Sequence, residues 1–418
     1  MAITRRQFVT RLGALAAAVG MSQADVSKMT ETFAGQTAAL GGFANKPRVV
    51  WIHGAECTGC STSLLSFLED PAGEAIYTTG ISTGTALGIA GVQSTQKTLG
   101  LADTASGFTL DGALRADGGL ANVADVVIDV VDLQYHETVM GMGGDLAYQW
   151  LKDFKANNTL PFVLVVEGAL QDADQGGAWG DTDGNGTAWC SIGMNDAGTE
   201  EHDMALTVKT LATKTACLAV IPIGQCACYG GYPGCKPPIT SAMAGGFDPK
   251  LAQSGAQGVA DYLNTHSASG AAGKVINVPG CPTNPWWFCL TVVMFLANVH
   301  DPSTMTPLMG TDYAGRLKNV YPIPVHSQWC PRYGDYVRGR YAAKPGDAGC
   351  LQKIGCKGIA TNSLCGVHGW NNQQPQNATS PVNLDTVKRG GHCTRAGAPC
   401  MACTEKGYPD SFVPFVKR

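Results

Sequence analysis

Three short apolar segments of this chain are each followed within a few residues by cysteine in a glycine-containing turn. They are RVVWIH at 48–53 with Cys57 and Cys60, CLAVIPI at 217–223 with Cys226, and KVINV at 274–278 with Cys281. Continuous β-branched runs of this length are typical of strands that are buried on both faces, as in a parallel sheet. Because open α/β sheets bind ligands at the carboxyl ends of their strands, the four thiols predict a 4Fe–4S cluster or a tetrahedral zinc ion there.

Further apolar runs and helix-like segments complete an alternating strand–helix pattern. The runs are 126–133 and 162–166, and the helix-like segments are 145–154, 202–214 and 286–299. This alternation favours a doubly wound α/β domain over residues 46–300. From about residue 301 the periodicity is lost, and Gly, Pro, Asn and Cys dominate a C-terminal domain over residues 301–418. With so little core-forming sequence, that domain is expected to be irregular and to be stabilised by metal clusters.

The C-terminal domain contains two more sets of four candidate ligands, one with an imidazole and three thiols and one with four thiols. They are His326, Cys330, Cys350 and Cys356, and then Cys365, Cys393, Cys400 and Cys403. With the strand-end cysteines, eleven of the sixteen cysteines and one histidine divide into three four-ligand sites. Other histidines have no such spacing, and structural roles are expected for His53, His136, His368 and His392.

Charged residues make up only 15% of the chain, against roughly 25% in an average soluble protein. A chain of 418 residues with so little charge is expected to bury a sizeable surface against a permanent partner. The alternative explanation of the low charge content is that the chain, with its 53 glycines, contains many Gly- and Ala-rich loops. The net charge of −4 gives no support for binding to nucleic acid or to an anionic membrane. The longest apolar run, at 285–299, is shorter than the roughly 18 residues of a membrane span, so no anchor is expected.

Residues 1–45 are expected to be an export segment and a lead-in. Arg5 and Arg6, followed by Phe8 and an apolar stretch at 12–19, are similar to a twin-arginine signal. Since that route exports folded proteins, it suits a protein whose metal is inserted before export. A chance basic N-terminus is the alternative.

Two insertions carry no firm function. Residues 76–122 are rich in Gly, Ala and Thr without a clear period, and DTDGNG at 181–186 matches the start of a calcium loop. Because Ile192 occupies the twelfth position of that loop, where a calcium site has Glu, a polar turn is favoured over a calcium site.

Six ordered motifs of this sequence resemble the small subunit of nickel–iron hydrogenases. They are ECTGC, GQCACYGG, VPGCPTNP, VHSQWCPR, GCLQKIGCKG and APCMACTE. The resemblance covers roughly residues 46–75 and 123–418. It implies a flavodoxin-like doubly wound parallel sheet that holds a proximal cluster beside a nickel site in a large subunit. A C-terminal iron–sulfur domain would hold a medial and a distal cluster.

The resemblance assigns the candidate ligands to three iron–sulfur clusters. By it, Cys57, Cys60, Cys226 and Cys281 bind a proximal 4Fe–4S cluster, His326, Cys330, Cys350 and Cys356 bind a distal 4Fe–4S cluster, and Cys365, Cys400 and Cys403 bind the medial cluster. Glu56 matches a motif position beside the proximal cluster. For this glutamate, a role in proton transfer and a role as a helix cap or surface carboxylate both stay open.

The sequence departs from the family pattern at several positions. His326 and Cys330 are spaced H-x3-C rather than H-x2-C, which puts the histidine ligand in question. Cys393 stands at about the position of a proline that, in many relatives, faces the vacant corner of a 3Fe–4S cluster. It therefore predicts a medial 4Fe–4S cluster, with 3Fe–4S as the alternative if Cys393 is a spare thiol. Oxygen-tolerant relatives add cysteines at the positions of Gly59 and Gly231, so a modified proximal cluster is not expected.

The resemblance implies that the chain relays electrons between a Ni–Fe centre in the large subunit, which cleaves H2 reversibly, and an external redox partner. The chain itself would carry no catalytic residue. A cytochrome c and a membrane quinone-reducing module both fit as that partner, and a higher oligomer of the heterodimer stays open. The expected location is the periplasm or the outer face of the cytoplasmic membrane.

Two alternatives belong to other functional classes. An exported polyferredoxin-type carrier for another oxidoreductase would have the same clusters but no nickel partner. A disulfide- or zinc-stabilised secreted binding protein would contain no iron and no reactive thiolates. The placement of four-ligand groups at glycine-rich strand ends argues against the second alternative.

Overall fold

The structure of the protein is a computed structural model. It describes residues 48–65, 131–171, 190–195, 197, 201–235, 256–300, 302–327, 330–368, 370 and 392–417. The expected export segment, the insertion at 76–122 and the DTDGNG turn lie outside the described residues.

Four strands form a parallel sheet in the order β2-β1-β3-β7. They are β1 (Arg48–His53), β2 (Asp132–His136), β3 (Phe162–Glu167) and β7 (Cys217–Ile223). Continuous apolar runs of the sequence predicted β1, β3 and β7, because each of these strands is buried on both faces. The run at 126–133 is described only from residue 131, and its strand extends from Asp132 to His136.

The segment at 274–278, predicted as a strand, lies along β7 through isolated parallel bridges. Ile276 donates its N–H to the Val220 carbonyl (2.9 Å), and Val278 donates to the Pro222 carbonyl (3.0 Å). Pro222 has no N–H to donate in return, so the ladder is interrupted at this residue. With this edge segment the strand order corresponds to 2-1-3-4-5, the order of flavodoxin-like folds. The predicted fold class is confirmed.

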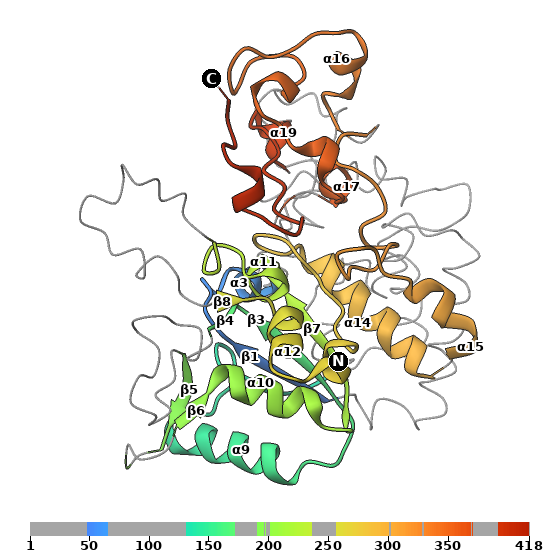
Figure 1. The fold of residues 1–418 in the computed structure, drawn as a ribbon. Helices are drawn as coiled ribbons and strands as arrows, with labels where there is room; N and C mark the ends of the chain where they lie inside the picture. The colour runs from blue at the N-terminus through green and yellow to red at the C-terminus, as the bar shows by residue number, and fades with distance from the viewer. Residues whose placement is uncertain are drawn as a thin grey trace, which may run out of the picture.

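Helices cover both faces of the sheet (Figure 1). Val49 and Trp51 of β1 pack toward α3 (Gly59–Leu65) and α14 (Pro285–His300). Val50 and Ile52 face the opposite side, where they join a second core. The helices of that side are α9 (Gly144–Asn157), α10 (Met204–Thr213), α12 (Val259–Thr265) and α13 (Ser269–Ala272). The three helices predicted from the sequence are therefore confirmed as α9, α10 and α14.

Shorter elements complete this part of the chain. Two small antiparallel pairs are formed by β4 (Leu170–Gln171) with β8 (Ala256–Gln257), and by β5 (Ser191–Met194) with β6 (Glu201–Asp203). The remaining short helices are α11 (Gly224–Tyr229), α15 (Pro302–Met305) and η6 (Thr306–Met309).

The C-terminal part is irregular, as the loss of periodicity predicted. It has the short helices α16 (Tyr333–Val337), η7 (Gln352–Ile354), η8 (Gly358–Ala360), α17 (Cys365–His368), α19 (Cys393–Ala396) and η9 (Asp410–Phe412). Among its described residues, Ala342, Leu351 and Ile354 are buried together in a small apolar cluster.

Figure 1 shows the C-terminal part, in orange to red, beyond α3 and α11 at one end of the sheet domain. Hydrogen bonds connect the two parts, from Gln225 Nε2 to the Glu405 carbonyl (2.8 Å) and from Trp370 Nε1 to the Cys281 carbonyl (3.0 Å). The C-terminal part therefore packs on the carboxyl edge of the sheet, where α/β folds bind ligands. Within the described ranges, no helix has both the length and the apolar character to cross a bilayer.

Candidate metal centres

Four thiols gather at the carboxyl edge of the parallel sheet. Cys57 precedes α3 and Cys60 lies within it, Cys226 lies in α11 directly after β7, and Cys281 follows the edge segment. Burial, and then the neighbouring Cys281 and Cys57 thiols, raise the pKa of Cys226 to about 12. Burial and the Glu167 carboxylate, with a smaller contribution from Cys226, raise the pKa of Cys60. The structure thus brings together the four residues that the sequence assigned to one site.

Glycine backbone approaches these sulfurs closely. A Cβ atom at Gly224, where φ is +86°, would lie 2.5 Å from Cys60 Sγ. A Cβ atom at Gly231, where φ is +53°, would lie 2.9 Å from Cys226 Sγ. The backbone N–H of Thr283 also lies 3.5 Å from Cys60 Sγ. Only glycine permits this combination of backbone angle and close approach, which leaves the sulfurs surrounded by main chain.

The donor set of this proximal site fits a metal cluster. Burial raises the pKa values of Cys60, Cys226 and Cys281, so these three thiols are neutral near pH 7 in the absence of a cation, and four thiolates at this site would repel one another. A coordinated metal deprotonates its thiol ligands and compensates their charge. Four soft sulfur donors, with backbone N–H groups near them, suit a 4Fe–4S cluster.

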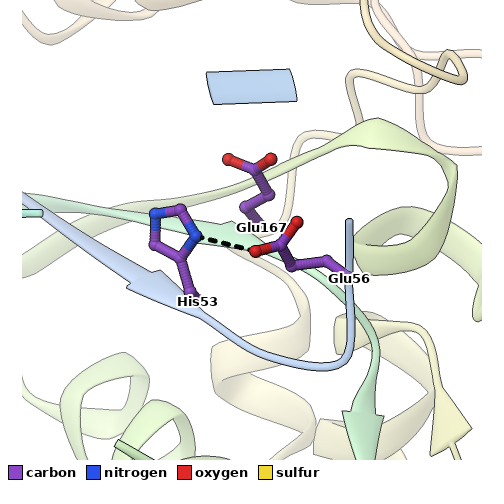
Figure 2. A group of neighbouring side chains, drawn as sticks. All are labelled: His53, Glu56 and Glu167. Atoms are coloured by element: carbon purple, nitrogen blue, oxygen red, sulfur yellow. Dashed lines mark hydrogen bonds and ion pairs between the residues drawn. The ribbon is translucent and has the colours of Figure 1, made fainter. Parts of the chain in front are cut away.

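Ionisable side chains lie beside the proximal thiols, at the ends of β1 and β3 (Figure 2). Glu167 accepts hydrogen bonds from the backbone N–H of Cys60 (3.0 Å) and from the N–H and hydroxyl of Ser61 (3.1 and 2.5 Å). His53 Nδ1 lies 3.1 Å from Glu56 Oε1. Of these residues the sequence pointed to Glu56 as a candidate, whereas only a structural role was expected for His53. The signal for His53 and Glu167 is their place as the last residues of buried strands at the ligand-binding edge.

Glu137 and His136 add two ionisable side chains to this group. Glu137 accepts the backbone N–H of His53 (2.9 Å), and burial raises the pKa of Glu137 to about 7. His136 Nε2 lies 3.2 Å from the Ser61 hydroxyl, and burial, together with the nearby His53, lowers the pKa of His136 to about 3. The group therefore combines a carboxyl that titrates near neutral pH with an imidazole that stays uncharged.

The second predicted ligand set lines one cavity in the C-terminal part, which we call the distal site. Its ligand side chains are His326, Cys330, Cys350 and Cys356. His326 Nε2 is buried and has no hydrogen-bond partner among the described residues, as a metal ligand would leave it. The spacing H-x3-C, which put this histidine in question, therefore does not separate its ring from the three thiols.

The third predicted set lines a neighbouring cavity, the medial site. Its thiols are Cys365, Cys393, Cys400 and Cys403. Burial raises the pKa of Cys403, and Cys365, Cys393 and Cys400 raise it further. Cys393 thus stands among the other three thiols, which makes a fourth ligand available at this site.

Two residues form part of the wall of both cavities, Val325 and Thr394. The Thr394 hydroxyl lies 3.6 Å from Cys330 Sγ of the distal site and 3.0 Å from Nδ1 of His392, which lines the medial site. The backbone N–H of Cys400 donates to Cys356 Sγ (3.3 Å). Medial and distal sites are therefore separated by single residues.

The other cysteines stand apart from the three sites. Cys217 and Cys289 are buried in the apolar cores, and Cys228 donates its thiol to the Pro222 carbonyl (3.4 Å). Cys190 and Cys235 are partly exposed. All sixteen cysteines lie within the described residues, and all are free of disulfides.

Two family models match this chain. A model of the C-terminal region of the NiFe/NiFeSe hydrogenase small subunit matches residues 321–416, and a model of the NADH ubiquinone oxidoreductase 20 Kd subunit matches residues 117–295. These ranges contain every candidate ligand except Cys57 and Cys60.

Curated proteins of similar sequence extend the likeness over the whole chain. The periplasmic [NiFeSe] hydrogenase small subunit of Desulfomicrobium baculatum is 26% identical over 99% of each chain. The periplasmic [NiFe] hydrogenase small subunit of Solidesulfovibrio fructosivorans is 27% identical over 100% of this chain and 93% of its own. Among solved structures, a Dm. baculatum [NiFeSe]-hydrogenase chain matches with a TM-score of 0.59 at 25% identity, over 89% of this chain and 99% of the other.

Proposed function

This chain belongs to the small-subunit family of nickel–iron hydrogenases, and we propose that it is the electron-transferring subunit of an enzyme that converts H2 reversibly into two protons and two electrons. The Ni–Fe centre would lie in a separate large subunit. The chain would hold three iron–sulfur clusters, which accept and release single electrons when bound. Its residues would fix the cluster positions, exclude water and connect one site to the next.

One observation carries the proposal, namely that the three thiol sites form a connected series. The Trp370 indole lines the medial site and donates its N–H to the carbonyl of the proximal ligand Cys281 (3.0 Å). At the other end of the medial site, Thr394 lines both the medial and the distal cavity. A chain that only needed metal for stability would have no reason to place its sites one residue apart in a row.

The donor sets indicate the cluster types that we propose. Cys57, Cys60, Cys226 and Cys281 would bind a proximal 4Fe–4S cluster, and His326, Cys330, Cys350 and Cys356 a distal one. The medial site would hold a 4Fe–4S cluster on Cys365, Cys393, Cys400 and Cys403. The place of Cys393 in the medial cavity supports four ligands there rather than three.

Glu56 is our candidate for moving protons beside the proximal site. Its carboxylate is 11% exposed, lies 3.1 Å from His53 Nδ1 and accepts the Thr58 hydroxyl (3.1 Å). Glu137, whose pKa burial raises to about 7, lies beside this pair and accepts the backbone N–H of His53 rather than a proton of its ring. The contact between the Glu56 carboxylate and the His53 ring supports a proton-transfer role over that of an isolated surface carboxylate.

The heterodimer and its location follow from the family. We propose a Ni–Fe large subunit as permanent partner, to which the low charge content of the chain would contribute a mostly uncharged contact surface. We propose export by the twin-arginine route to the periplasm, in line with periplasmic relatives. The domain boundaries at residues 46, 300 and 418 belong to the same proposal.

The experiment that tests the function is anaerobic purification through this chain, followed by metal analysis and EPR of oxidised and reduced samples. We expect about twelve irons per chain, a co-purifying nickel subunit and no oxidised 3Fe–4S signal. Iron without nickel in an intact complex would support the polyferredoxin-type carrier instead. Absence of iron would end the proposal.

A pair of variants tests the medial cluster. Cys393→Ala should produce a strong oxidised 3Fe–4S signal, because one cluster corner loses its thiolate. Cys235→Ser is the matched control, since this thiol lies outside the three sites, and it should leave the spectrum unchanged. A 3Fe–4S signal already present in the unaltered protein would refute the assignment of Cys393 and leave the hydrogenase proposal standing.

A further inference from the structure

The end of the chain that contains the distal site is basic, whereas the chain as a whole is acidic. Residues 330–360, which we call the distal face, contain six basic and two acidic residues, a net charge of +4 against −4 for the whole chain. The basic residues are Arg332, Arg338, Arg340, Lys344, Lys353 and Lys357. Figure 1 places α16, in this segment, at the end of the C-terminal part that is remote from the parallel sheet.

Both acidic side chains of the distal face have partners within it. Asp335 forms an ion pair with Arg340, and Asp347 accepts the backbone N–H of Lys344 (3.1 Å). Arg332 is turned inward and donates to backbone carbonyls. The charge that this face presents to solvent is therefore positive. It is carried by the exposed side chains of Arg338, Arg340, Lys344 and Lys353.

Apolar side chains are exposed within this basic face. Val337 is 67% exposed and Ile359 is 58% exposed. Ile359 also lines the distal cavity with His326, and the Tyr336 ring lies 4.4 Å from the His326 ring, centroid to centroid. An apolar centre with a charged rim is typical of protein interfaces, and here it lies directly over the end of the cluster series.

We infer that the distal face is the docking surface for a small electron-carrier protein whose own surface is acidic around its redox group. The inference rests on the proposed function, because it takes the distal site as the place where electrons leave or enter. Opposite charges steer such an encounter and raise association rates by about 10–10³-fold at low ionic strength. A basic c-type cytochrome would instead meet like charge at this face, so of the two kinds of soluble carrier the acidic one is favoured.

The test uses the anaerobically purified complex and two probe carriers, an acidic ferredoxin and a basic c-type cytochrome. H2-driven reduction of each carrier is measured at ionic strengths from about 10 to 500 mM, which shortens the screening distance from roughly 30 Å to a few Å. We expect kcat/KM for the acidic carrier to be at least about tenfold higher at the lowest ionic strength and to fall as salt is added. The cytochrome should show the opposite salt dependence.

Charge reversal locates the effect on the molecule. The double variant Arg338→Glu/Lys353→Glu should lower kcat/KM for the acidic carrier about tenfold at low salt and should have little effect at about 500 mM. Lys152→Glu is the matched control, because Lys152 is an exposed lysine on α9, on the far side of the sheet domain (Figure 1). It should leave both carriers unaffected.

A second readout separates this inference from the proposed function. Exchange between H2 and D2O at the Ni–Fe centre needs no carrier, so its absence from the unaltered complex would count against the proposed function. Normal exchange together with a preference for the basic cytochrome, or with no effect of the double variant, would overturn the docking inference. Binding to vesicles of anionic phospholipid that the double variant abolishes would assign the face to a membrane surface and would overturn it as well.

Discussion

Arg316 has no exposed side-chain surface and lies in a segment of the C-terminal domain that hydrogen-bonds to the sheet domain, where Asn277 donates its N–H to the Gly315 carbonyl (2.9 Å). Its Nη1 donates to Glu405 Oε1 (2.7 Å), and its Nε donates to Asp312 Oδ2 (2.8 Å). Glu405 follows the medial ligand Cys403 by two residues and also accepts the backbone N–H of Asn362 (2.6 Å). The ion pair thus holds the turn that carries the last medial ligands against the end of the sheet domain.

Replacing Arg316 by methionine would leave Glu405 without its counter-charge. The Glu405 side chain is 2% exposed, whereas that of Asp312 is 12% exposed and can recover some hydration. Breaking a buried ion pair typically costs about 3–5 kcal/mol, because the remaining charge stays desolvated. We expect Arg316→Met to lower the free energy of unfolding by about 3–4 kcal/mol and to release iron from the medial site. Adding Glu405→Gln removes the orphaned charge and should restore roughly 1–2 kcal/mol.

The assay is thermal unfolding of the anaerobic complex together with iron analysis. A loss of about 3 kcal/mol should lower the melting temperature by at least roughly 5 °C. Arg340→Met is the matched control, because it breaks an ion pair whose arginine is 62% exposed, and such pairs contribute only about 0–1 kcal/mol. Equal effects of the two arginine variants would refute the reasoning, and so would a double variant no more stable than Arg316→Met.

Three further predictions concern single residues. Thr394→Val should lower the distal-cluster potential by about 40 mV in an EPR-monitored redox titration, because a hydrogen bond to a thiolate is lost at roughly 1 kcal/mol. Gly224→Ala should remove the proximal cluster from the EPR spectrum, since its Cβ would lie 2.5 Å from Cys60 Sγ, whereas Gly339→Ala, at a similar φ of +68° but in open space, should retain it. Burial raises the pKa of Glu137 from 4.5 to about 7, so the folded protein binds more protons than the unfolded chain between these values and its stability falls as pH rises through them. Glu137→Gln should flatten that part of the plot of melting temperature against pH.

Much of the fold was predictable because the strands of a parallel sheet are buried on both faces, and their sequences are therefore continuously apolar. Segments such as Phe162–Glu167 are buried on both faces, and a continuous apolar run of this length, rich in β-branched residues, is typical of such a strand. The edge segment at 274–278 shows where that reasoning stops. Its composition is that of a strand. Its pairing with β7 is nevertheless interrupted, because Pro222 of β7 has no backbone N–H to donate. The side chains of one segment do not reveal whether the backbone of the adjacent strand has the N–H groups needed to pair with it.

The ligand sets were predictable for a similar reason, whereas the contacts between them were not. Cysteines that follow apolar strands, or that lie only a few residues apart, can be grouped into sets of metal ligands from the sequence alone. Trp370 and Thr394, which connect the medial site to its neighbours, lie far in sequence from the Cys281 and Cys330 ligands that they contact. Their residue types are common in ordinary loops, so only the folded chain reveals that they connect sites.

The same structure accounts for how the C-terminal part can hold two sites with so little core of its own. The apolar cluster of Ala342, Leu351 and Ile354, among the described residues of this part, is small, so on the proposed function metal ligation would contribute to ordering the C-terminal part. The buried Arg316 ion pair and the Trp370 hydrogen bond then attach this part to the sheet domain. Because ligation would order the loops and those contacts fix their position, we expect cluster insertion and correct spacing of the three proposed sites to occur together. On the proposed function, a chain assembled in this way would be competent for electron transfer only after it has folded around its metal.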